Sequence, residues 1–372
     1  MKKSKVYFTS MRAMPGDSLL KKLARLMDEA GFASIDFNQK FTAVKIHFGE
    51  PGNLAFIRPN FAKVVVDEVK KLKGKPFLTD CSTLYVGRRK DALEHMDAAY
   101  ENGFSPFSAG CQIVIGDGLK GSDEVLIPVK GGEFVKEAKI GRAVMDADVF
   151  ISLNHFKGHE ATGFGGALKN IGMGCGSRAG KMEMHNAGKP YVDGAKCVGC
   201  GICVKTCAFD AIKMSAQKAV LDDNTCVGCG RCLAMCPADA IRTKWDESNS
   251  VLNKKIAEYT WAVLEGRPHF HINLVMDISP LCDCLSGNDM AIIPDVGLFA
   301  SFDPVALDVA SADACNKMPV MPGSALAEVS CEEHDHDDHF NLMHPETSWM
   351  DCVDHAEKLE IGTKSYEIVE VK

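Results

Sequence analysis

The feature that most constrains this chain is a run of eight cysteines within residues 197–236, half of the sixteen cysteines in the sequence. The run contains the spacing C-x2-C-x2-C-x3-C twice, and the second copy follows the first by 29 residues. The copies also share neighbouring residues: Val198-Gly199 recurs as Val227-Gly228, Gly201 as Gly230, and Asp210-Ala211-Ile212 as Asp239-Ala240-Ile241. An internal repeat of this kind predicts a small module with two equivalent halves.

Iron–sulfur chemistry explains this spacing. Three cysteines at two-residue intervals wrap one face of a cubane from a tight loop, whose glycines let backbone amides approach the cluster sulfurs. The fourth cysteine lies too far along the chain for that loop and is expected to ligate the other cluster. The repeat resembles the bacterial-type two-cluster ferredoxin. We therefore expect two [4Fe-4S] clusters, one held by Cys197, Cys200, Cys203 and Cys236, the other by Cys226, Cys229, Cys232 and Cys207.

Zinc is the alternative occupant, since CxxC pairs also build zinc sites. Four ligands per zinc ion do not explain why the full CxxCxxCxxxC run occurs twice. One departure from the ferredoxin pattern is Ala208, where a proline is expected, although Pro237 is present in the second copy. That proline mainly fixes the backbone, so cluster ligation is expected to survive its replacement.

Charge and hydropathy exclude several partners. The net charge of −8 provides no basic surface for nucleic acid or anionic lipid. No N-terminal apolar signal is visible, and no run approaches the roughly 18 apolar residues of a membrane span. A cytoplasmic location is therefore expected, where thiols stay reduced and dense cysteine spacing indicates metal.

Outside the repeat, apolar strands alternate with amphipathic helices. Strands are expected at 5–9, 42–48, 76–79, 112–115, 149–153, 269–276 and 365–371, and helices at 18–30 (with Asp17 as the N-cap), 59–72, 91–102, 253–264 and 304–314. This alternation is typical of an α/β fold with a mainly parallel sheet and helices on both faces. We expect one α/β domain, residues 1–189 and 247–372, interrupted by a small ferredoxin-like α+β insert at 190–246.

Polar residues follow several of these strands, at the edge where ligands of open α/β sheets bind. Lys45 and His47 alternate with apolar residues and are expected to face a cleft. Asp80 follows the strand at 76–79. The alternative for these residues is simple solvent exposure or, for Asp80, a capping role.

The glycine-rich stretch 154–176 carries His155, His159, Lys169 and Cys175. Glycine at this density lets backbone amides crowd a ligand, and a helix beginning after Gly166 would offer its N-terminus to an anion. The dinucleotide-binding and Walker motifs are both incomplete, which disfavours NAD or ATP. His155 and His159 are candidates to bind a metal ion with Cys175, the alternative being ordinary hydrogen-bonded histidines.

Cys282 and Cys284 follow the strand at 269–276. Their spacing is too tight for an ordinary disulfide, so they are expected either to bind a soft metal or relay redox chemistry, or to be buried free thiols. Cys111, Cys315, Cys331 and Cys352 are expected to be structural, and the acidic, histidine-rich run at 332–339 to be a solvated loop.

Several of these segments together resemble one family. The stretches are VKIHFGEPG (44–52), TDCSTLYVGRR (79–89), NHFKGHEATGFGGALKNIGMGC (154–175), the cysteine repeat, DISPLCDC (277–284) and DPVALD (303–308). They are similar to the DUF362 family, in its subgroup with an inserted ferredoxin domain, over nearly the whole chain. The resemblance implies the insert and the discontinuous α/β domain. It implies no catalytic residues, because the family is largely described as iron–sulfur proteins of unknown function.

The sequence predicts an iron–sulfur electron-transfer protein, and first of all a redox enzyme that passes electrons between the two clusters and a site on the α/β domain. The candidate catalytic residues are Lys45, His47, Asp80, His155, His159, Lys169, Cys175, Cys282 and Cys284. The site is expected to hold an additional metal ion or an anionic small-molecule substrate. The alternative is a non-enzymatic ferredoxin-like carrier or adaptor, whose α/β domain docks a redox partner protein. Convergence of the candidates on one pocket favours the enzyme.

Overall fold

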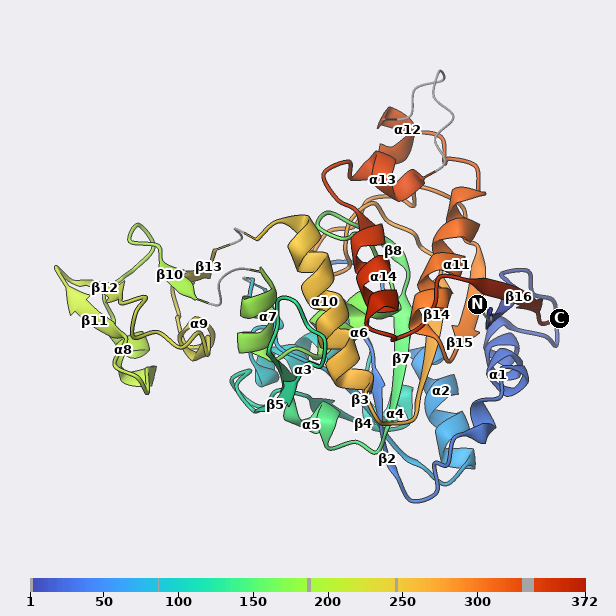
Figure 1. Ribbon diagram of the computed structural model, residues 1–372, viewed down its shortest axis with the longest axis horizontal. Coiled ribbons are helices and arrows are strands. Elements are labelled where there is room, and N and C mark those ends of the chain that lie inside the picture. The colour runs from blue at the N-terminus through green and yellow to red at the C-terminus, as the bar shows by residue number, and fades with distance from the viewer. Residues whose placement is uncertain (1–2, 86, 186–188, 245–246, 330–337) are drawn as a thin grey trace.

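The computed structural model describes residues 3–85, 87–185, 189–244, 247–329 and 338–372. Its centre is an eight-stranded sheet with the order β16-β1-β15-β14-β7-β2-β3-β4 (Figure 1). Its strands are β1 (Ser4–Ser10), β2 (Phe41–Lys45), β3 (Lys75–Asp80), β4 (Gln112–Ile115), β7 (Val149–His155), β14 (His269–Val275), β15 (Gly297–Ser301) and β16 (Tyr366–Glu370). All neighbours pair in parallel except β15, which is antiparallel to both β1 and β14. The predicted α/β fold with a mainly parallel sheet is confirmed.

Helices cover both faces of this sheet. One face carries α1 (Leu19–Glu29), α2 (Pro59–Lys71), α3 (Ala92–Glu101) and α4 (Pro106–Ala109), and the other α6 (Ala167–Cys175), α10 (Asn249–Leu264), α11 (Pro304–Asn316) and α14 (Trp349–Lys358). Successive residues of a strand point to opposite faces, so Phe150 of β7 packs in the core under α6 and Ile151 in the core under α1. Both side chains are fully buried. Two hydrophobic cores therefore hold the ends of the central strands in fixed positions.

The start of α1 differs from the prediction. Ser18, not Asp17, is the N-cap, and its hydroxyl accepts from the Lys21 amide at 3.4 Å. The Asp17 carboxylate instead forms two hydrogen bonds of 3.0 Å with the Arg25 guanidinium. Because Arg25, two turns along the helix, binds the Asp17 side chain, the adjacent Ser18 caps the helix instead.

The other elements outside residues 190–243 are short. They are the 3-10 helix η1 (Phe32–Ser34), the hairpin of β5 (Glu124–Pro128) and β6 (Glu137–Gly141), α5 (Arg142–Met145), the pair β8 (Lys157–His159) and β9 (Gly163–Gly165), α7 (Arg178–His185), α12 (Ala325–Val329) and α13 (His339–Met343). Of these, β8 and α7 carry residues of the site described below.

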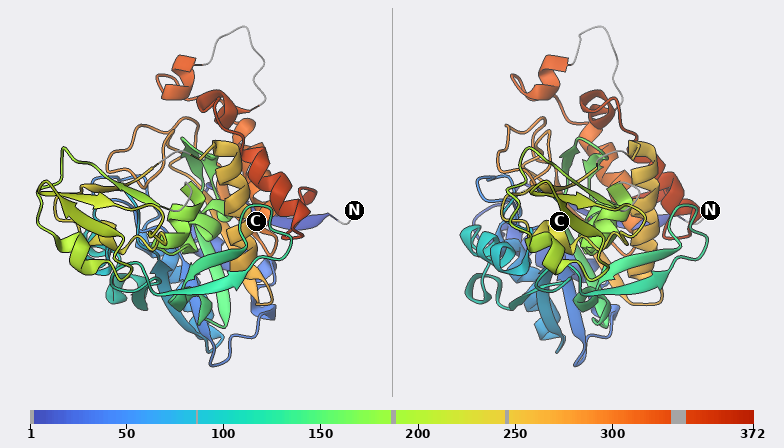
Figure 2. Two further views of the ribbon diagram at one scale, coloured as in Figure 1. Left: turned by 60° about the vertical axis from the view of Figure 1, so that its left-hand side comes forward. Right: turned by 90° about the vertical axis from the view of Figure 1, so that its left-hand side faces the viewer.

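Residues 190–243 form two small sheets of their own and, among the described residues, add no strand to the large sheet. The elements are β10 (Pro190–Val192), α8 (Ile202–Thr206), β11 (Ile212–Ser215), β12 (Lys218–Leu221), α9 (Arg231–Ala234) and β13 (Ile241–Thr243). β10 pairs with β13 and β11 with β12, both antiparallel. This segment projects from the side opposite the two termini (Figure 1) and faces the reader in the right-hand view of Figure 2.

The sequence repeat in this segment is also a repeat of backbone conformation. Gly199 and Gly228 have φ values of +71° and +72°, and Gly201 and Gly230 of +70° and +64°. These left-handed values favour glycine, which explains why the same positions are glycine in both halves. Strands β14, β15 and β16, which follow the segment in the chain, lie in one sheet with strands that precede it. The exact boundaries 1–189, 190–246 and 247–372 stay a prediction.

Candidate functional site

A cavity of about 480 Å³ lies at the carboxyl ends of β2, β3 and β7 and beside the loop that follows β14. Residues of α6, α7 and α10 form its other walls. Because β2, β3, β7 and β14 are mutually parallel, their carboxyl ends meet at one edge of the sheet, where α/β proteins bind ligands. Polar segments that are far apart in the sequence therefore converge here.

Seven of the nine candidate residues line this cavity. They are Lys45, His47, Asp80, His155, His159, Lys169 and Cys284. Cys282 lies at its wall, where its Sγ is 3.5 Å from the Nζ of Lys169. Cys175 does not line it, because its side chain is buried in the hydrophobic core and its carbonyl oxygen accepts from the Cys81 thiol at 3.5 Å. All four predicted segments thus reach one site.

The expected grouping of His155, His159 and Cys175 around a metal ion does not form. The Nε2 of His155 lies 2.9 Å from the Met276 carbonyl oxygen, and its Nδ1 lies 3.3 Å from the Asp283 carboxylate. Both ring nitrogens are therefore engaged by the protein. Within the described part of the chain, the side chains that can share one ion are instead His159, Cys282 and Cys284, whose ligand atoms lie within 4.8 Å of one another.

Buried charges beside the cavity form a connected network. The Nζ of Lys45 lies 2.9 Å from the Asp80 carboxylate. Burial by itself raises the pKa of Asp80, but the attraction of Lys45 outweighs it and the pKa stays well below its usual range. Arg89 extends the network, with its Nη1 2.8 Å from the Nε2 of His47 and its Nε 2.8 Å from the Glu50 carboxylate.

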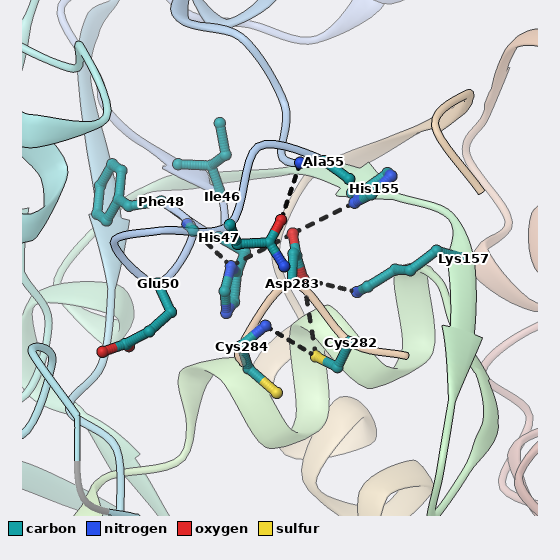
Figure 3. A network of polar contacts seen from close by, with 12 residues as sticks. Ile46, His47, Phe48, Glu50, Ala55, His155, Lys157, Cys282, Asp283 and Cys284 are labelled. Carbon is teal, nitrogen blue, oxygen red and sulfur yellow. Dashed lines mark hydrogen bonds and ion pairs between the residues drawn. The ribbon is translucent and has the colours of Figure 1, made fainter. Parts of the chain in front are cut away.

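Asp283 holds the other half of the network (Figure 3). Its fully buried carboxylate lies 3.0 Å from Lys157, 3.3 Å from His155 and 3.4 Å from His47. Burial raises the pKa of Asp283, but His47 and Lys157 outweigh it and the pKa stays well below its usual range. The Nη1 of Arg89 faces the Nε2 of His47, and the Gly49 amide donates to the Nδ1 of the same ring at 3.0 Å. An ionised Asp283 therefore fixes the turn between the two cysteines.

Cys282 and Cys284 flank this aspartate, and the Sγ of Cys282 lies 3.7 Å from its carboxylate. The Cys282 Sγ accepts from the Cys284 amide at 3.3 Å. Burial raises the pKa of Cys282, but the hydrogen bond from Cys284 and the positive charges of Lys157 and Lys169 outweigh it, and the pKa falls well below its usual value. The same hydrogen bond raises the pKa of Cys284 well above its usual value. The two neighbouring thiols therefore have pKa values shifted in opposite directions.

The N-terminus of α6 does not bind an external anion, contrary to the expectation from the sequence. Its amides at Ala167 and Leu168 donate to the Asp308 carboxylate at 2.7 and 2.9 Å. Asp308 is fully buried on α11, within the DPVALD stretch. A side chain at Gly166 would collide with this carboxylate, which explains the glycine there. The chain supplies its own anion, and this pairing of distant segments could not be read from the sequence.

The eight cysteines of the repeat surround two small cavities. One is lined by Cys197, Cys200, Cys203 and Cys236, and the other by Cys207, Cys226, Cys229 and Cys232. In each, three cysteines come from one half of the repeat and the fourth from the other half. Backbone amides donate to three of these sulfurs: Ala219 to Cys197 at 3.4 Å, Gly228 to Cys226 at 3.5 Å, and Ala240 to Cys236 at 3.2 Å. Four thiols with amide donors fit the ligand set of a [4Fe-4S] cluster.

Helix α7 lies between the cysteine segment and the large cavity. A side-chain atom placed on Gly230 would lie 2.8 Å from Arg178 and 2.9 Å from Met182, so the segment packs directly on this helix. One turn apart on the same helix, Lys181 and His185 line the large cavity. Leu84 lines that cavity too and belongs to the hydrophobic cluster around Cys197, Cys203, Cys232 and Cys236.

The sequence did not single out several residues of the site. Arg89 is 1% exposed and Lys157 4% exposed, although both fall in motif stretches already noted. Lys181 and His185 also line the cavity, and burial lowers the pKa of His185 to about 3. A charged residue in a polar stretch of sequence is normally interpreted as exposed to solvent. Only the folded structure shows that these side chains are enclosed.

The remaining predicted features divide in two. Cys111, Cys315 and Cys352 are buried free thiols in the hydrophobic cores, as expected of structural cysteines. Cys331 and positions 332–337 of the histidine-rich run lie outside the described residues.

A family model described as "Domain of unknown function (DUF362)" matches residues 42–313. No curated protein matches the chain. Two solved structures are similar over long stretches. A Thermotoga maritima protein has 14% identity and a TM-score of 0.39, covering 82% of this chain and 59% of its own. The lactate racemase apoprotein from Thermoanaerobacterium thermosaccharolyticum has 11% identity and a TM-score of 0.39, covering 97% and 79%.

The chain thus spans less than two thirds of the Thermotoga maritima protein. Among the described helices, none combines the length and the apolar composition that crossing a membrane requires.

Proposed function

Since the chain belongs to the DUF362 family, whose function is not defined, we propose from its own residues that it is an iron–sulfur redox enzyme with an inserted two-cluster ferredoxin-like unit. In this proposal the two [4Fe-4S] clusters exchange electrons with a reaction site in the 480 Å³ cavity. The substrate is a small anionic molecule.

One observation carries the proposal: the repeat cysteines surround two cavities in a three-plus-one arrangement with crossed fourth members. The spacing of the bacterial two-cluster ferredoxin requires this crossing of Cys207 and Cys236. Two independent zinc sites would not require each half of the repeat to lend one cysteine to the other. The amide donors to Cys197, Cys226 and Cys236 add the hydrogen bonds that stabilise thiolate ligands.

When bound, each cluster supplies one-electron transfer. The chain has a surface suited to electron transfer on each side of the pair of clusters. Cys200, in the first set of ligands, is exposed, and the neighbouring Val198 is 69% exposed, which suits contact with an external electron donor or acceptor. Gly230, which lines the second small cavity with Cys232, packs against α7, and α7 also lines the large cavity. We infer that electrons enter or leave at the first cluster and reach the substrate from the second.

The residues of the cavity suit an anion that is protonated or deprotonated as it is reduced or oxidised. Lys169 and Lys181 line the space, and within the described part of the chain neither forms an ion pair with a carboxylate. Asp283 contacts both His155 and His47, and burial lowers the pKa of His47 against the opposing effect of the Asp283 charge. Such groups bind and orient a substrate and hold protons close to it.

The carrier alternative predicts the same clusters but requires no enclosed polar site on the α/β domain. The observation that favours an enzyme is the buried network around Asp80 and Asp283, which opens on one cavity. Burying this many charges is costly unless each is paired, and such networks concentrate at functional sites. A protein that only docks a partner would not need them.

The test is anaerobic purification of the full chain with metal and sulfide analysis. The proposal expects about eight irons and eight sulfides per chain. In a potentiometric titration followed by electron paramagnetic resonance, two one-electron reductions are expected. Fewer than about four irons, or zinc in their place, would contradict the proposal.

A further inference from the structure

Three soft ligand atoms meet at the wall of the large cavity. A nitrogen of His159 and the sulfurs of Cys282 and Cys284 all lie within 4.8 Å of one another. In a tetrahedral site with metal–sulfur bonds near 2.3 Å, ligand atoms are separated by about 3.5–3.8 Å. The three side chains therefore need only a small inward movement to bind one ion. They come from β8 and from the loop after β14, which lie far apart in the sequence.

The surroundings hold these ligands ready. Asp283, between the two cysteines, is fixed by three cationic or imidazole partners, and its carbonyl oxygen accepts from the Glu50 amide at 3.0 Å. Gly158 packs so closely against the Pro280 backbone that a side chain there would collide with it, which keeps β8 beside the cysteine loop. The cysteine loop and the strand before His159 are thus locked together whether or not an ion is present.

The groups that contact these three side chains also suit a metal site. The Cys284 amide and the Lys169 ammonium both point at the Cys282 sulfur, at 3.3 and 3.5 Å. Donors of this kind stabilise a metal-bound thiolate. The Nδ1 of His159 accepts from the Ala161 amide at 3.1 Å and lies 3.9 Å from the Glu160 carboxylate, and these contacts hold the ring in its orientation.

We propose that His159, Cys282 and Cys284 bind one thiophilic divalent metal ion, with Zn²⁺ as the best match, and leave its fourth coordination position open to the cavity. Two thiolates neutralise the ion, and an imidazole completes a set of two sulfurs and one nitrogen that favours zinc over magnesium or calcium. Three protein ligands with one open position are the pattern of catalytic rather than structural zinc. His159 and Cys284 line the cavity, so a substrate anion there can take the fourth position.

This inference deepens the proposed reaction site but does not need the clusters to be correct. The test uses the full chain, purified anaerobically, incubated with Zn²⁺ and desalted. We expect about one zinc per chain in addition to the iron. The X-ray absorption fine structure of zinc should fit two sulfur neighbours at about 2.3 Å and one nitrogen neighbour at about 2.0–2.1 Å. Zinc and iron absorb X-rays at different energies, so the iron of the clusters does not mask the zinc signal.

The decisive variants are Cys284→Ser and His159→Gln. Cys284 is only partly buried, so its replacement is tolerated better than that of the fully buried Cys282. Both variants are expected to weaken zinc binding at least tenfold and to leave the iron and sulfide content unchanged. Cys315→Ala, which removes a fully buried thiol elsewhere, is the matched control and is expected to keep the zinc.

The outcomes separate the two proposals. Full iron with no stoichiometric zinc in the wild type, or zinc retained by Cys284→Ser, overturns the metal site and leaves the clusters intact. Zinc bound by four sulfurs with little iron contradicts the clusters instead. Even in that case, a zinc ion with two sulfur ligands and one nitrogen ligand that is lost in His159→Gln supports the proposed metal site. If the wild type shows no such zinc ion, the metal site is overturned.

Discussion

The Nζ of Lys45 lies 2.9 Å from the Oδ1 of Asp80, and the two side chains are 1% and 4% exposed. They stand at the ends of β2 and β3, which are neighbouring parallel strands. Each charge therefore depends on the other for its stability in the interior. This pair joins the sheet to the cavity and gives the first prediction.

Lys45→Met is expected to lower the free energy of unfolding by about 3–5 kcal/mol, because it removes the cation nearest to the buried Asp80 carboxylate, whose other cation, Arg89, is 3.7 Å away. Urea unfolding followed by circular dichroism measures the effect. The matched control is Lys63→Met, which removes an exposed i,i+4 pair with Asp67 and should cost no more than about 0.5 kcal/mol. The double variant Lys45→Met, Asp80→Asn is expected to regain much of the loss. A Lys45→Met protein as stable as the control would contradict this account of the pair.

Double cysteine variants test the crossed ligand sets. Cys197 and Cys236 line one small cavity, so Cys197→Ser with Cys236→Ser should remove about four irons per chain, as either single change does. Cys197→Ser with Cys207→Ser touches both cavities and should remove about eight. Iron and sulfide analysis after anaerobic purification distinguishes the two. The reverse order of losses would mean that each half of the repeat keeps its own fourth cysteine.

The contact of the cysteine segment with α7 is tested at two equivalent glycines. Gly230→Ala places a methyl group against Arg178 and Met182, whereas Gly201→Ala meets nothing within 4 Å. Both positions have positive φ, so both variants should lose a similar 1–2 kcal/mol of local stability. Only Gly230→Ala is expected to increase hydrogen exchange in α7, because only there must the two parts separate. Equal exchange in both variants would show that the contact does not stabilise the helix.

Stability is expected to fall between about pH 6.5 and pH 4 because of His269. Burial lowers the pKa of His269 to about 4, and its Nδ1 faces the Nε2 of His271 at 2.8 Å. In this window the unfolded chain binds a proton that the folded chain does not, so acidification favours unfolding. The shift is worth about 3 kcal/mol over the window, at about 1.4 kcal/mol per pKa unit.

His269→Gln should make the free energy of unfolding less dependent on pH in that range, whatever its effect at pH 7. Urea unfolding at half-unit pH intervals gives the two slopes. An unchanged slope would assign the acid sensitivity to other groups.

The sequence was informative for features that depend on residues close together in the chain. The spacing of Cys197 to Cys236 predicted which cysteines surround each small cavity, because loop length alone limits what a cysteine can reach. Lys45 was recognised from alternation, Asp80 from its place after a strand and His155 from its glycine-rich stretch, and parallel pairing of the strands explains why the three converge.

The failures involve partners that are distant in the sequence. The Asp308 carboxylate occupies the amides at the start of α6, and the Asp283 and Met276 contacts take both nitrogens of His155. Neither pairing produces a periodic pattern or a characteristic residue spacing in the sequence. Cys282 and Cys284, which the sequence offered as a separate metal-binding pair, therefore group with His159 in the structure, whereas Cys175 and His155 do not.

The position of β7 between β2 and β14 has a consequence for biosynthesis. When β7 leaves the ribosome, β2 is ready to pair with one of its edges, but β14 has not been made. The other edge stays open while the whole cysteine segment and α10 are translated. Unpaired strand edges promote aggregation, so the nascent protein is most vulnerable during this interval. The cysteine segment is itself completed within this interval, before the sheet that it interrupts can close.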